Sequence, residues 1–183
     1  MIADAADANR HPFWQFSLRA YARPGVAAAC LGLQESRGAD VNVVLLTVWL
    51  ASQGRRLDAA TLDRVRAVSR RWQADVVGPV RAARRAAKAM APGLYAQLKA
   101  TELACEQAEQ LALAALVADL PTAAVTASDR VQLATAGLRA CLLAAPHVAE
   151  VTDEEAGWLT ALAAVAGTLF VTPTDAAGRP PSA

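Results

Sequence analysis

Two runs of charged side chains with helical spacing are the residues best placed to do chemistry. They are Arg81, Arg84, Arg85 and Lys88 on one segment and Glu102, Glu106 and Glu109 on the next. Intervals of three and four residues put each run on one face of a helix. The turn signal at Pro92-Gly93 predicts an antiparallel hairpin between them. In that hairpin Arg81 lies beside Glu102 and Glu106.

This pairing has two interpretations. The first is a set of interhelical ion pairs, each worth ~0–1 kcal/mol if exposed. The second is a polar pocket in which an arginine holds an anionic ligand or the carboxylates hold a metal. Helical di-metal sites usually add Glu-x-x-His motifs, which this sequence lacks. We therefore expect no metal and no cofactor.

The segment GADVNVVLLTVWLA, residues 38–51, adds two polar residues at the start of an apolar run. Asp40 follows a helix-ending glycine, so its carboxylate can accept the free amides of a new helix. Asn42 lies in the first turn near a core and must satisfy both a donor and an acceptor. The candidate polar cluster is therefore Asp40, Asn42, Arg81, Glu102 and Glu106. The question is whether Asn42 meets the last three.

Composition predicts an all-α protein. About a quarter of the chain is alanine, the best helix former, while the aromatic residues that favour strands are few. A length of 183 residues suits one domain. We expect a single-domain bundle of six or seven helices around a buried central helix at about residues 40–53. The predicted divisions are a flexible N-terminus at 1–11, a helical domain at 12–171 and a disordered tail at 172–183.

Caps and prolines mark the helix boundaries. Pro79 lacks an amide proton, so the long helix that Asp58 caps should kink or break there. Thr152 and Glu155 form a capping box at the start of the last helix. The other signals are Pro12 and Pro24 at helix starts, Gly38 and Gly54 at helix ends, and prolines around helices at about 94–118 and 128–144.

The last predicted helix bears on partners, because no charged residue lies between Glu155 and Asp175. An exposed helix normally carries a charged face. This helix is therefore either central, which we favour, or covered by a protein partner or a second copy of the chain. The candidate interface residues are Trp158, Leu162, Leu169 and Phe170.

Charge argues against nucleic acid. The 18 basic residues nearly balance 17 acidic ones. RNA binding through the Arg-rich segment 55–88 stays open as a hypothesis, but the acidic segment 100–160 offers it an internal partner and no aromatic residues interleave with the arginines. The longest uncharged apolar stretch, 156–171, is shorter than the ~20 residues of a membrane span. Three scattered cysteines indicate a reducing compartment, and we expect a soluble cytoplasmic protein.

Motifs of the common enzyme classes are missing. His11 and His147 have no ligand spacing, and Ser17 lacks the glycine-flanked elbow of hydrolases. Phosphate loops and dinucleotide fingerprints are absent. These absences argue against an enzyme and leave only a rarer class open.

The first half of the chain carries a series of short motifs. They are FWxFSLxxY at 13–21, PGV at 24–26, ACLxLQ at 29–34, DVN at 40–42, Trp49 and, more loosely, KATELACE at 99–106. Together, over about residues 12–110, they resemble the uncharacterised proteobacterial family called domain of unknown function 2390. The resemblance implies a soluble helical protein and supplies no activity or catalytic residue.

The resulting functional hypothesis is a non-catalytic adaptor or regulatory protein that acts through protein–protein interaction. The alternative is a small-molecule-binding protein or enzyme whose pocket gathers the candidate polar cluster. That alternative requires the five side chains to converge around a concave, partly buried space.

Overall fold

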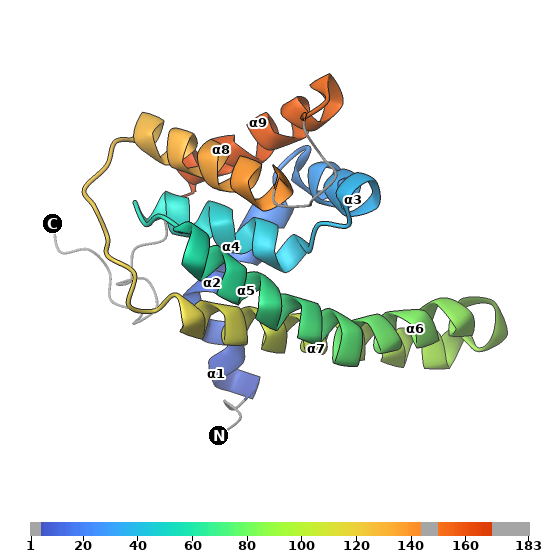
Figure 1. Cartoon of the computed structure of the whole chain (residues 1–183). Coiled ribbons are helices and arrows are strands. Elements are labelled where there is room, and N and C mark those ends of the chain that lie inside the picture. The colour runs from blue at the N-terminus through green and yellow to red at the C-terminus, as the bar shows by residue number, and fades with distance from the viewer. Residues whose placement is uncertain (1–4, 144–149, 170–183) are drawn as a thin grey trace, which may run out of the picture.

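The fold is all-α, as the composition predicted. The computed structural model describes residues 5–143 and 150–169, and no strand occurs among them. Figure 1 shows the elements in order. They are α1 (Ala5–Arg10), α2 (Pro12–Tyr21), α3 (Val26–Arg37), α4 (Val41–Ser52), α5 (Ala59–Trp72), a π-helical segment (Gln73–Val77), α6 (Gly78–Met90), α7 (Pro92–Leu116), α8 (Ala127–Leu143) and α9 (Asp153–Thr168).

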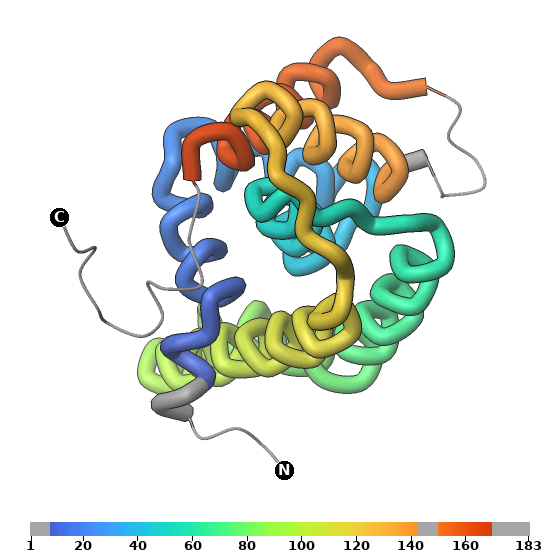
Figure 2. The backbone as a smooth tube through the Cα atoms, turned by 90° about the vertical axis from the view of Figure 1, so that its left-hand side faces the viewer, coloured from blue at the N-terminus to red at the C-terminus, as the bar shows by residue number. Residues whose placement is uncertain are grey.

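Helix α4 is the centre of the molecule, as predicted for residues 40–53. Every residue from Asn42 to Ser52 is buried. The helix packs against α2, α3, α5, α7, α8 and α9, and Figure 2 shows it enclosed by the surrounding helices. An almost continuous apolar sequence is therefore explained by burial on all sides.

The other helices form two groups on either side of α4. Helices α3, α8 and α9 pack together on one side, and α5, α6 and α7 lie on the other. Helix α2 bridges the groups through contacts with α3, α4 and α7. Helices α6 and α7 form the predicted antiparallel hairpin, which extends beyond the rest of the molecule (Figure 1).

The predicted caps are confirmed. Gly38 ends α3 with a left-handed φ of 62°, a conformation that glycine adopts without steric cost. The carboxylate of Asp58 accepts the amide of Thr61 at 2.7 Å and begins α5. At the start of α9 the Thr152 hydroxyl accepts the Glu155 amide at 3.3 Å, while the Glu155 carboxylate accepts the Thr152 amide at 2.9 Å. Local sequence thus fixes where these helices begin and end.

The predicted kink at Gly78-Pro79 takes the form of the π-helical segment Gln73–Val77. Pro79 has no amide to donate, and the Gly78 amide donates to the carbonyl of Gln73, five residues earlier. The break is therefore a local widening of one continuous helix.

The structure describes part of the predicted N-terminal segment and none of the predicted tail. Residues 5–10, within the predicted flexible N-terminus, form the short helix α1. Its Asn9 contacts α2 and α7, because Gln15 donates to the Asn9 carbonyl at 2.6 Å and Gln107 donates to the Asn9 side chain at 2.8 Å. The predicted disordered tail, 172–183, lies outside the described residues.

Replacing Thr152 with alanine is expected to lower the free energy of unfolding by about 1 kcal/mol, because the first turn of α9 loses its side-chain cap. Chemical denaturation followed by circular dichroism measures the change. Thr160→Ala is the control, since the exposed Thr160 hydroxyl bonds only to the Ala156 carbonyl within the same helix. Equal losses in both variants would contradict the assignment of the cap.

Candidate functional site

A cavity of about 620 Å³ lies between α2, α3, α4, α6 and α7. Its lining includes all five members of the candidate polar cluster, Asp40, Asn42, Arg81, Glu102 and Glu106. They come from the start of α4 and from the two helices of the hairpin. The structure thus brings together residues that are more than sixty positions apart in the sequence.

The charged residues of the hairpin pair as the predicted register requires. Arg81 donates from Nε to Glu102 and from Nη2 to Glu106, at 2.8 Å in each case. Arg84 makes a second ion pair with Glu102. These ion pairs line the cavity, so pairing and pocket formation occur together. Glu102, with a side chain only 9% exposed, is well shielded from water.

Asn42 meets Glu109 and Gln110 instead of the Arg81 and Glu102 side chains. Its Nδ2 donates to Glu109 Oε2 at 2.8 Å, and its Oδ1 accepts from Gln110 Nε2 at 2.9 Å. A longer bond of 3.4 Å reaches the Glu106 carbonyl. Gln110 Oε1 in turn accepts from the Ser17 hydroxyl at 2.9 Å. The side-chain nitrogen and oxygen of Asn42 therefore both have hydrogen-bond partners inside the bundle.

Asp40 performs the predicted capping and makes a second contact. Its Oδ1 accepts the Asn42 amide at 2.7 Å, and its Oδ2 accepts the Ser69 hydroxyl of α5 at 2.5 Å. The carboxylate therefore joins the start of α4 to α5. No cation forms an ion pair with it in the described part of the chain, which leaves an uncompensated negative charge beside the cavity.

Glu109 is fully buried behind this group. Its Oε2 accepts from Asn42 at 2.8 Å and from Gln73 at 2.9 Å, whereas its Oε1 has no hydrogen-bond partner. Burial, followed by the charge of Asp40, raises the pKa of Glu109 to about 8. At neutral pH the carboxyl is therefore protonated, and its proton can be donated to Asp40.

The two glutamates that pair with Arg81 have pKa values shifted in opposite directions. Burial and the charges of Glu102 and Asp40 raise the pKa of Glu106, against the opposing effect of Arg81. The pKa of Glu102 is lowered, because hydrogen bonds from Arg84 and Arg81 outweigh the effect of its burial. Acidic groups at this end of the cavity thus outnumber the guanidinium groups that neutralise them.

Large apolar side chains also line the cavity. Six large hydrophobic side chains are exposed in the described residues, and four of them line this cavity. They are Leu18 (47% exposed), Tyr21 (39%), Leu31 (49%) and Leu103 (51%). Exposed apolar groups that gather around a polar floor are typical of a ligand site.

The candidate interface residues of the last helix lie largely inside the molecule. Leu162 and Leu169 belong to the core, and Trp158 is partly buried with its ring against Gly32 of α3. Phe170 lies outside the described residues. The uncharged face of α9 is accounted for by its contacts with α3, α4 and α8.

Several arginines of segment 55–88 have partners within the chain. Arg55 and Arg66 donate to backbone carbonyls near the ends of α7 and α8, and Arg81 and Arg84 pair with glutamates. Arg56, Arg70, Arg71, Arg85 and Lys88 are exposed. Acidic side chains of segment 100–160 therefore pair with two of the ten basic residues, Arg81 and Arg84, and backbone carbonyls of the same segment accept from Arg55 and Arg66.

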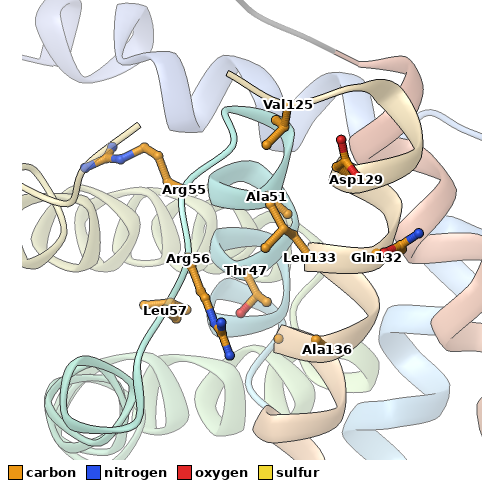
Figure 3. Close-up of a pocket in the computed structure, with 11 residues that line it drawn as sticks. Thr47, Ala51, Arg55, Arg56, Leu57, Val125, Asp129, Gln132, Leu133 and Ala136 are labelled. Atoms are coloured by element: carbon orange, nitrogen blue, oxygen red, sulfur yellow. The ribbon is translucent and has the colours of Figure 1, made fainter. Parts of the chain in front are cut away.

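A second cavity, of about 420 Å³, lies between α4, α8 and the segment that joins α4 to α5. Figure 3 shows that its polar side chains do not converge, because Arg55 points away from Thr47 and Asp129 lies on the far side from Arg56. Asp129 is engaged at the start of α8, where it accepts the Thr126 amide at 2.9 Å. This cavity offers no group of polar atoms to a ligand.

Metal and membrane sites find no support in the described residues. Within 5–143 and 150–169, no three His, Cys, Asp or Glu side chains are arranged to hold a metal ion. In the same ranges no helix has the length and apolar character to cross a bilayer.

Sequence reasoning missed Ser17, Gln73 and Gln110, and it placed Glu109 on the charged stripe without expecting its burial. Ser17 and Gln110 are 93 residues apart, and neither belongs to a charge pattern. Glu109 continues the spacing of Glu102 and Glu106, but α7 by then has left the protruding hairpin and entered the body of the bundle. The position of Glu109 in the C-terminal half of α7 was the one sequence signal for its burial.

Comparisons with known proteins identify a family and no activity. Neither the curated proteins nor the solved structures contain a match to this chain. Residues 12–113 match a family described as protein of unknown function (DUF2390), and this range contains every residue that lines the larger cavity. The match covers more than half of the sequence, so the chain belongs to the DUF2390 family.

Proposed function

We propose that this protein binds a small molecule in the cavity between α2, α3, α4, α6 and α7. The observation that carries the proposal is the convergence of a buried polar network and four exposed apolar side chains on one cavity of about 620 Å³. That volume suits a metabolite-sized ligand. Such a ligand would place a polar end against Asp40 and Glu106 and an apolar body against Leu18, Leu31 and Leu103.

The cost of the polar network supports a functional role. Burying polar side chains stabilises a fold less than apolar packing of the same volume. Ser17, Asn42 and Gln110 are buried and line one cavity, and the buried Glu109 lies behind them, where apolar residues would pack without such a requirement. A network of this kind holds the groups above it in fixed positions.

The test is a ligand screen with a matched pair of variants. The purified protein is screened against a metabolite library by thermal shift, and hits are measured by calorimetry. Leu103→Trp is expected to fill the cavity and weaken binding at least tenfold. Leu94→Trp is the control, because Leu94 lies on the same helix with a similar exposure, 49% against 51%, but outside the cavity.

Two results would count against the proposal. The first is a screen in which no compound raises the melting temperature. The second is a hit whose affinity is reduced equally by Leu103→Trp and Leu94→Trp, since the ligand would then bind elsewhere.

A protein-binding adaptor role is the second candidate, and the tip of the α6–α7 hairpin favours it. Met90 is 82% exposed and Leu94 is 49% exposed, on the part of the fold that projects furthest (Figure 1). A double variant with glutamate at both positions should lose any partner that the wild-type protein retains in affinity purification from its native host. Identical sets of retained proteins would remove this candidate.

A further inference from the structure

The hydrogen-bond donors of the buried network at the larger cavity, and those of Arg81 and Arg84, are largely engaged, whereas the exposed Arg85 forms no ion pair with the described residues. Asn42, Gln73 and Gln110 donate to Glu109 or to one another, and Ser17 donates within the same network. Arg81 and Arg84 direct their guanidinium groups to Glu102 and Glu106. A ligand that needs donors from the protein would have to break these bonds or bind Arg85.

Acceptors, in contrast, remain available at the same end. Glu106 Oε1 accepts from Arg81, while its Oε2 accepts no hydrogen bond from the described residues. The carboxylate of Asp40 has hydrogen-bond donors but no ion pair within the described ranges. A ligand that supplies hydrogen-bond donors can therefore bind here without displacing a bond within the protein.

The charged groups at this end of the cavity also favour a positively charged ligand. The carboxyl groups that face the cluster are Asp40 at the start of α4 and Glu102, Glu106 and Glu109 on α7. The guanidinium groups are those of Arg81 and Arg84 on α6, with Arg85 exposed and unpaired; the phenol of Tyr21 on α2 is neutral. Because Glu109 is protonated at neutral pH, three carboxylates, Asp40, Glu102 and Glu106, share the two paired guanidinium groups, and the exposed Arg85 is a further cation on the cavity wall.

We propose that the ligand is an organic cation, a primary amine or guanidine with an apolar body, whose charged head lies between Asp40 and Glu106. This inference rests on the proposed small-molecule function and specifies its ligand class. An ammonium group supplies the hydrogen-bond donors and the positive charge that this end of the cavity lacks. The apolar body contacts Leu18, Leu31 and Leu103.

Binding of such a cation is linked to the proton on Glu109. A positive charge beside Asp40 favours the ionised form of the neighbouring Glu109, so the ligand and the proton compete. Cation binding therefore releases the Glu109 proton to solvent, and affinity rises as the pH is raised from 6 towards the Glu109 pKa of about 8.

The experiment compares three probes that share one body. They are 4-phenylbutylamine, 4-phenylbutanol and 4-phenylbutanoate, measured by calorimetry with the full-length protein. The amine is expected to bind at least tenfold more tightly than the alcohol, and the carboxylate is expected to bind most weakly. Tighter binding of the carboxylate would assign the site to Arg85 and overturn the inference, as would equal binding of amine and alcohol.

Variants separate the site from general electrostatic attraction. Glu106→Gln is expected to weaken amine binding about tenfold, whereas Glu35→Gln, an exposed acidic residue on α3 outside the cavity, leaves it unchanged. Glu109→Gln removes the increase of affinity with pH. Loss of binding in Glu35→Gln as well, or a pH dependence that survives Glu109→Gln, contradicts the inference.

The experiments distinguish an error in the proposed cationic ligand from an error in the proposed small-molecule function. If the library screen yields neutral or anionic ligands sensitive to Leu103→Trp, the cavity binds small molecules and the cationic class is wrong. If none of the three probes binds at millimolar concentration, the cationic class is also wrong, and the screen alone then decides on the cavity.

Discussion

Replacing Glu109 with glutamine is expected to stabilise the fold by up to about 5 kcal/mol at pH 9 and to have little effect near pH 5. The pKa of Glu109 is about 8 in the folded protein against 4.5 for a free glutamate. The folded state therefore binds the proton more tightly, so the contribution of Glu109 to wild-type stability is greatest below pH 4.5 and falls as the pH rises to about 8. Each pKa unit corresponds to about 1.4 kcal/mol.

Glutamine removes this loss because it resembles the protonated acid. Its carbonyl oxygen can accept from Asn42 and Gln73, and its amide can donate to Asp40. Urea denaturation at several pH values measures the difference, which grows from pH 5 and becomes constant above pH 8. Glu102→Gln is the control, since Glu102 is held ionised by Arg81 and Arg84 and its replacement destabilises the protein at neutral pH. Parallel stability curves for wild type and Glu109→Gln would contradict the protonated state.

Replacing Arg55 with alanine is expected to cost about 3 kcal/mol of stability, since three backbone carbonyls lose their donor. The Arg55 side chain donates to Leu120 at 3.0 Å, to Ala118 at 2.8 Å and to Val117, where α7 ends. Arg55 itself is only 8% exposed. Its guanidinium group thus terminates α7 and holds the following segment against the end of α4.

The neighbouring residue provides the control for this effect. Arg56 is exposed and has the same charge, so Arg56→Ala should change the free energy of unfolding by no more than about 0.5 kcal/mol. Arg55→Lys should retain only part of the stability, because a single ammonium group cannot donate to the three carbonyls as the planar guanidinium group of arginine does. A small loss for Arg55→Ala would mean that water replaces the guanidinium group.

The sequence predicted those parts of the fold that local chemistry decides. Gly38, Asp58 and Thr152 each determine a helix end through backbone conformation or a side chain within three residues, and all three are confirmed. The pairing of Arg81 with Glu102 and Glu106 was also accessible, because one proline-glycine turn sets the register of a hairpin.

The floor of the cavity could not be predicted in the same way. Asn42 was recognised as a residue that needs partners, but its partners, Glu109 and Gln110, lie on a helix whose position relative to α4 depends on packing. Helix α1 was not predicted for a related reason. It is held by contacts with α2 and α7, and its own short sequence does not indicate them. Long-range contacts leave no periodic pattern from which they can be inferred.

The π-helical segment determines which side chains of the long α5–α6 helix can act together. Successive residues of a regular α-helix turn by about 100°, so two residues eight apart differ by about 80°. The wider π turn takes up one extra residue, which brings Gln73 and Arg81 close to one face. Arg81 Nη1 consequently donates to Gln73 Oε1 at 3.4 Å, while Gln73 Nε2 reaches Glu109. A regular α-helix of the same length would instead turn Arg81 about 80° away from Gln73, so the one extra residue of the π turn sets the alignment of the cavity's charged wall with its buried floor.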